Sequence, residues 1–114
     1  MQAARLADTA SSPIDLDHLA RQTLGDPAIR REVLDLFVAE MSAARGQLVG
    51  SGQCNRAELA HRIKGAARGI GANPVAETAA ALEAEPDRIE LTAALLVRMH
   101  EAMCFITEQA LDKD

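Results

Sequence analysis

A histidine, a lysine and a glycine stand at helical spacing near the middle of the chain, at His61, Lys64 and Gly65. A neutral imidazole is a nucleophile, and histidine is the side chain that is readily neutral near pH 7. A lysine three residues further along a helix would place a mobile positive charge on the same surface. Phosphoryl transfer requires mainly a positioned nucleophile and positive charge near the phosphate oxygens, so these residues suit that chemistry.

A helical wheel predicts how the three residues are presented. With Leu59 at zero and about 100° per residue, His61 falls at about 200°, on the side opposite the apolar stripe. That stripe consists of Leu59, Ile63, Ala66 and Ile70. Gly65 is unusual, because a glycine inside a helix costs about 0.8–1 kcal/mol relative to alanine. Beside an exposed nucleophile, however, a missing side chain would let a bulky partner approach closely.

Helix signals recur along the whole chain, and no segment alternates as a strand would. A short helix is predicted from residue 15 or 17 to residue 24, with Gly25 just past its end. Asp26 and Pro27 then supply a cap and a first-turn proline for a long amphipathic helix that ends near residue 50.

The segment 51–55 is predicted to be a loop whose last residue, Asn55, caps a third helix that ends between residues 68 and 70. Asn73 and Pro74 repeat the pairing of a cap with a proline and begin a helix through residue 84. A break at 85–87 precedes a final helix from about 89 to 111.

Four substantial helices with short connections predict an all-α fold, an antiparallel up-down four-helix bundle with a short additional N-terminal helix. Residues 1–12 are expected to be a flexible tail, and 13–114 to form the bundle domain.

Composition limits the possible functions. The chain has 114 residues, a formal net charge of −5 and neither Trp nor Tyr, which argues against binding nucleic acid. It lacks a long apolar run and a secretory signal, so we expect a cytoplasmic protein without a membrane span. Its two cysteines have no neighbours at ligand spacing, so we expect no metal site. A bundle of this size can be stable as a monomer.

One basic patch interrupts this acidic composition. Between Arg56 and Arg68 there are four cations and one acid, a local net charge of +3 without His61. Such a patch would steer acidic partners or phosphates toward the histidine.

Each residue also has a plainer interpretation. An exposed helical histidine is usually a solvated surface residue. His18 and His100 lack a Lys-Gly pair after them and are expected to be structural or surface residues. Glu83 and Glu85 are expected to form a solvated acidic helix end.

The run from His61 to Ala72, HRIKGAARGIGA, favours a functional interpretation of His61 over the plainer one. It closely resembles the signature of histidine-phosphotransfer (HPt) domains, H-x-L-K-G-[SA]-[SA]-x-x-[LI]-G-A, with Ile63 where leucine is commoner. A looser similarity in helix order extends from about Ile14 to Leu111. The resemblance implies a carrier, not an enzyme, that shuttles a phosphoryl group between aspartates of receiver domains in a two-component phosphorelay.

The resemblance also implies roles for individual residues. His61 would accept the phosphoryl group at Nε2, Lys64 would stabilise it, and Gly65 would give the receiver access. Partner contacts are expected at Arg68, Ala57 and Arg62, the first of these by our own extension along the helix. No cofactor is expected, because the Mg²⁺ used in this family belongs to the receiver.

Two alternatives remain open at this point. A helical adaptor could bind and modulate a receiver or a histidine kinase without carrying phosphate, although pure binding needs neither a nucleophile nor a cation beside it. The chain could also be part of a larger hybrid kinase, while Met1 and the polar termini favour a free-standing protein.

Overall fold

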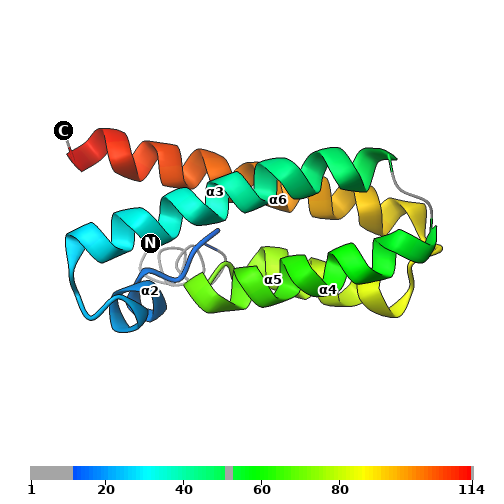
Figure 1. The fold of residues 1–114 in the computed structure, drawn as a ribbon, viewed down its shortest axis with the longest axis horizontal. Coiled ribbons are helices and arrows are strands. Elements are labelled where there is room, and N and C mark those ends of the chain that lie inside the picture. The colour runs from blue at the N-terminus through cyan, green and yellow to red at the C-terminus, as the bar shows by residue number, and fades with distance from the viewer. Residues whose placement is uncertain (1–11, 51–52, 114) are drawn as a thin grey trace, which may run out of the picture.

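The computed structural model describes residues 12–50 and 53–113, and side chains over 12–50 and 55–108. Over these residues the regular elements are all α-helices, labelled as in Figure 1. They are α2 (Leu16–Gln22), α3 (Pro27–Gly50), α4 (Gln53–Ile70), α5 (Asn73–Ala84) and α6 (Ile89–Lys113). The predicted all-α fold, four long helices with a short leading one, is confirmed. The expected tail, 1–12, lies outside the described residues except for its last residue.

The four long helices run antiparallel to one another along the chain (Figure 1). α4 packs against α3 and α5, and α6 closes the bundle against α5 and α3, so that α4 and α6 lie across its diagonal. α2 packs against α4. Large buried side chains from all four helices fill the core: Phe37, Met41, Leu48, Ile63, Leu82, Leu95 and Met99. The described ranges contain no helix capable of spanning a membrane.

The end of α2 differs from the prediction. The helix begins at Leu16, within the predicted range, and Asp15 caps it by accepting a hydrogen bond from the backbone N–H of His18 at 3.1 Å. The helix stops at Gln22, before the predicted residue 24, because Leu24 adopts a left-handed backbone with φ 56°. Gly25 N–H then donates to Ala20 O at 2.9 Å, which closes the helix end. Leu24 therefore occupies a position at which glycine is usual.

A tight turn joins α4 to α5. Gly71 has φ 80°, and Ala72 N–H donates back to Ala67 O at 2.8 Å, the bond of a glycine-terminated helix end. The predicted end of this helix between residues 68 and 70 is confirmed, at Ile70. The predicted cap at Asn73 is wrong, because the turn leaves Ala72 at the N-cap without a side-chain bond and makes Asn73 the first helical residue. Pro74 keeps its place in the first turn.

The start of α4 is the other difference. Asn55 was predicted to cap this helix, yet helical backbone already begins at Gln53. No glycine or proline stands between Gln53 and Asn55, so nothing prevents the helix from extending back toward the end of the link. Asn55 is therefore an exposed residue of the first turn, and the capping position falls outside the described residues.

Candidate functional site

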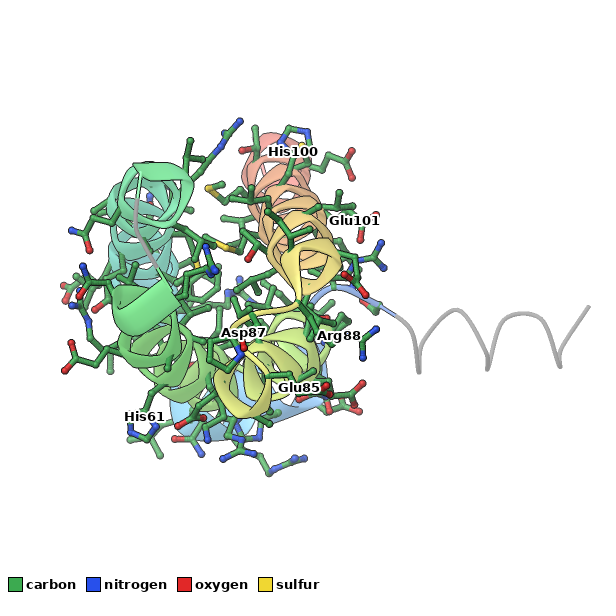
Figure 2. All side chains as sticks on the ribbon, turned by 90° about the vertical axis from the view of Figure 1, so that its right-hand side faces the viewer. His61, Glu85, Asp87, Arg88, His100 and Glu101 are labelled. Carbon is green, nitrogen blue, oxygen red and sulfur yellow. The ribbon has the colours of Figure 1, made fainter. Side chains whose placement is uncertain are left out.

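His61 lies on the outer face of α4, as the helical wheel predicts. Its side chain is 67% exposed, whereas Ile63, two residues further on, is 2% exposed and faces the core. Ala60 and Ala67 are completely buried, so the buried stripe of α4 extends toward α5 more than the predicted one, and Ala66 is only half-buried. Figure 2 shows His61 on the opposite side of the bundle from His100. The candidate nucleophile is therefore open to a partner.

A glutamate on the neighbouring helix holds the imidazole. The Nδ1 atom of His61 lies 2.8 Å from Oε2 of Glu83, near the end of α5. The other oxygen of the same carboxylate, Oε1, accepts a hydrogen bond from Nζ of Lys64 at 2.5 Å. One carboxylate thus joins the candidate nucleophile and the candidate cation.

This contact selects one form of the imidazole. An ionised carboxylate can only accept hydrogen bonds, so Nδ1 must carry the hydrogen that points at Glu83. In the neutral ring the lone pair then resides on Nε2, on the far side of the ring from Glu83. Nε2, the nitrogen expected to bear the phosphoryl group, therefore carries no hydrogen and is directed away from α5.

The same two hydrogen bonds keep Glu83 ionised. The bond from Lys64, and after it the bond from His61, hold the pKa of the Glu83 carboxyl below its ordinary value of 4.5. Glu83 is 30% exposed and Lys64 only 19% exposed, so the ammonium group is held under the surface beside the exposed ring. At neutral pH the site is therefore one carboxylate between a cation and an imidazole.

The surface around His61 is open on the side of Gly65. A Cβ atom placed on Gly65 would meet no atom within 4 Å, so tertiary packing does not require a glycine there. Arg62 and Arg68 are exposed on the same helix, and Ala57 is half-buried one turn before His61. The structure thus brings His61 and Lys64 together through Glu83, and leaves the expected partner contacts accessible.

Two of the four cations in the predicted patch are engaged within the fold, Lys64 with Glu83 and Arg56 with the link that follows α5. Nε of Arg56 donates to Pro86 O in the link between α5 and α6 at 2.9 Å. Arg56 therefore ties the start of α4 to the end of α5. Arg62 and Arg68 are the cations of the patch that stand exposed, Arg62 next to His61 in the chain and Arg68 about two turns further along α4.

The interpretation of Glu83 as part of a solvated acidic helix end is corrected by its contacts with His61 and Lys64. Glu85 fits that interpretation, because it is exposed and its Oε2 lies 3.6 Å from Nη1 of Arg88. A signal for Glu83 was available in the sequence. His61 lies ten residues before Gly71 and Glu83 eleven after Ala72. A turn of only these two residues brings both side chains to the same level of two antiparallel helices, since each residue rises about 1.5 Å.

The other two histidines take no part in the site. A Cβ on Gly71 would lie 3.1 Å from Cδ2 of His18, so the ring of His18 packs against the α4–α5 turn. His100 lies on α6 with its Nε2 3.4 Å from Sγ of Cys104. Within the described residues no three His, Cys, Asp or Glu side chains gather as metal ligands would.

An exposed histidine on a helical bundle, with a lysine and a glycine beside it, defines a class of phosphocarrier modules. In agreement with this, a family model described as "Hpt domain" matches residues 32–104, and the chain belongs to that family. Its members take part in histidine phosphotransfer within two-component phosphorelays, where they interact with receiver domains and histidine kinases. Neither the search of curated proteins nor that of solved structures returned a match.

Proposed function

We propose that this protein carries a phosphoryl group on Nε2 of His61 between the aspartates of two receiver domains. The observation that carries this proposal is the contact of Nδ1 with Glu83, which leaves Nε2 as the free, outward nitrogen of an exposed ring. The protein acts as a covalent intermediate in a chain of transfers and is not an enzyme.

The chemical step follows from the orientation of the ring. The lone pair of Nε2 attacks the phosphorus of an aspartyl phosphate on the first receiver, and the phosphorus–oxygen bond to the aspartate breaks. The bonding electrons leave on the aspartate carboxylate. The imidazole keeps its hydrogen on Nδ1 and becomes positively charged, and the carboxylate of Glu83 at 2.8 Å stabilises this charge. Transfer to the second receiver is the reverse of this step.

Lys64 and Gly65 support the step in different ways. Lys64 places an ammonium group in the same network, and a lysine side chain is long enough to swing toward phosphoryl oxygens once they arrive. Gly65 leaves free the space through which the receiver brings its aspartate to Nε2. Arg62, Arg68 and Ala57 are proposed as contacts to the receiver, whose active site is acidic.

A transfer assay tests the proposal. Receiver domains from the same cell, phosphorylated and supplied with Mg²⁺, are mixed with wild type and with His61→Gln, and phosphate is followed on this protein. We expect an acid-labile, base-stable label on wild type and none on His61→Gln, which should keep the circular dichroism spectrum and melting temperature of wild type because residue 61 is exposed.

Two outcomes would contradict the proposal. Labelling of His61→Gln at the wild-type level would place the phosphoryl group on another residue. Binding of a receiver without any label on wild type would favour the adaptor function, in which the bundle modulates its partner without carrying phosphate.

A further inference from the structure

A histidine and a cysteine form a pair on the outer face of α6. Nε2 of His100 lies 3.4 Å from Sγ of Cys104, and both side chains are exposed. Neither cysteine was expected to have a neighbour at ligand spacing. For Cys104 this expectation is wrong, because His100 stands four residues before it and one helical turn brings the two side chains to the same face. Figure 2 shows His100 on the opposite side of the bundle from His61.

The distance between the two atoms suits a bound metal ion. In a tetrahedral zinc site the metal lies about 2.3 Å from a cysteine sulfur and about 2.0–2.1 Å from a histidine nitrogen, which places these two ligand atoms about 3.5–3.6 Å apart. The 3.4 Å between Sγ and Nε2 is within about 0.2 Å of that spacing. A thiolate beside an imidazole also favours Zn²⁺ over Mg²⁺ and Ca²⁺, which bind oxygen ligands. The pair therefore occupies two adjacent corners of a zinc tetrahedron.

The other two corners must be filled from outside this pair. Structural zinc sites have four protein ligands, and among the residues that the structure describes no third His, Cys, Asp or Glu joins these two. A second copy of the chain brings an identical His100 and Cys104. A two-fold axis through the metal would then complete the tetrahedron with two sulfurs and two nitrogens.

The face of α6 around the pair is suited to contact with the same face of a second copy. The exposed residues of this face follow one another at intervals of four, three and four residues, which is the spacing of the seam between two paired helices. They are Ala93, Val97, His100 and Cys104. Two small apolar side chains are too few to hold together two chains that each have a net charge of −5, so the metal must provide most of the attraction.

We propose that His100 and Cys104 are half of a zinc site, which a second copy of the chain completes through the same face of α6. Each thiol gives up its proton to solvent as the ion binds, and the two thiolates neutralise the charge of Zn²⁺. The His61 side chains of both copies stay accessible, because His61 lies on the opposite side of the bundle. Zinc binding here does not depend on the proposed phosphoryl transfer.

Metal titrations of the whole, reduced chain test the site, with Co²⁺ and Zn²⁺ as probes. Co²⁺ should give the absorption bands of thiolate coordination, Zn²⁺ should displace it, and binding should saturate at one ion per two chains. Sedimentation velocity should show a monomer in chelator and a dimer with Zn²⁺.

Variants of the two ligands should lose both properties. Cys104→Ser and His100→Ala should each bind Zn²⁺ more than about a hundredfold more weakly and stay monomeric. Each change removes two of the four ligands, whereas loss of a group that only supports a ligand already costs about 10–100-fold in affinity. Both positions are exposed, so both variants should keep the wild-type melting temperature in chelator.

Three further variants serve as controls. Cys54→Ser removes the other cysteine of the chain and His61→Gln removes the phosphotransfer histidine, and both should keep wild-type zinc binding. Val97→Glu keeps both ligands but brings like charges together across the contact, so zinc-driven association should weaken about tenfold or more.

Four outcomes would overturn the proposal. One zinc ion per monomer, with no change in sedimentation, would exclude the shared site. Wild-type affinity in Cys104→Ser, or loss of binding in His61→Gln, would place the ion at other residues. A dimer that chelator leaves intact would need no metal.

Discussion

Removal of the Glu83 carboxylate should slow phosphoryl transfer while His61 remains in place. In wild type the carboxylate fixes the ring through Nδ1 and holds Lys64 with its other oxygen. Glu83→Ala removes both contacts. Glu83→Gln keeps an oxygen that can accept from Nδ1 but loses the negative charge. The two variants therefore separate orientation of the ring from stabilisation of its charge.

The expected magnitude follows from the geometry. Without Glu83 the imidazole has two orientations about χ2 and two neutral tautomers, so about one state in four keeps a bare Nε2 in its present place. Loss of the negative charge beside the phosphorylated ring slows transfer further. We therefore expect transfer to Glu83→Ala to be about tenfold slower in total. Because Glu83 is 30% exposed, water can stabilise part of the charge on the ring when the carboxylate is removed, which limits the loss of rate. The transfer rate of Glu83→Gln should lie between those of Glu83→Ala and wild type.

The assay is single-turnover transfer from a phosphorylated receiver, with Glu85→Ala as the matched control. Glu85 lies at the same helix end, exposed beside Arg88, and its removal should leave the rate unchanged. Nitrogen-15 spectra of the imidazole give a second readout, because wild type should show the hydrogen on Nδ1 and Glu83→Ala a mixture of tautomers. A wild-type rate and a wild-type spectrum for Glu83→Ala would refute the reasoning.

Four further outcomes are expected. The pKa of Glu83 is lowered from 4.5, chiefly by the hydrogen bond from Lys64. The stability that the ionised carboxylate contributes is therefore present above pH 4.5 and is lost as the pH falls through the lowered pKa. In urea unfolding, the difference in free energy of unfolding between wild type and Glu83→Gln should be constant above pH 4.5 and shrink below it. Gly65→Ala should stabilise the protein by about 0.8–1 kcal/mol in urea and slow receiver transfer, and a faster transfer would contradict the role given to the missing side chain. Leu24 is 85% exposed with φ 56°, so Leu24→Gly should raise the free energy of unfolding by about 1 kcal/mol, and a destabilised variant would show that its side chain is needed. Leu82 is completely buried, so Leu82→Ala should lower the free energy of unfolding by about 2–5 kcal/mol, and a change below about 1 kcal/mol would contradict the packing described for α5.

The reactive residue and the helices that carry it could be predicted from the sequence because both depend on local patterns. The apolar spacing of the third predicted helix is enough to turn His61 outward, and the run from His61 to Ala72 is a contiguous motif. The end of α4 at Ile70 falls within the predicted range, and Gly71 follows it because glycine readily adopts the positive φ of that turn.

The features that the sequence did not reveal are a contact between two helices and the exact ends of three helices. Glu83 reaches His61 from another helix, so its part in the site depends on the register of α4 against α5. Asn55 and Asn73 are residue types that often cap helices, but both have helical backbone here. Asn55 lies inside α4 because the helix already begins at Gln53, and Asn73 lies inside α5 because the turn at Gly71 places the cap at Ala72. Leu24 has a backbone conformation that its residue type disfavours, and no pattern in the sequence predicts it.

Because a two-residue turn joins α4 to α5, the contact between His61 and Glu83 requires a fixed number of residues between them. One residue inserted between them would rotate the following helix by about 100° and shift it by about 1.5 Å, which separates the carboxylate from the ring. Outside the site, the buried core and Gly71, this segment should therefore tolerate substitutions, but nowhere should it tolerate changes in length. A chimaera that joins this protein to another of its family should exchange the segment whole, with crossover points before α4 and after α5.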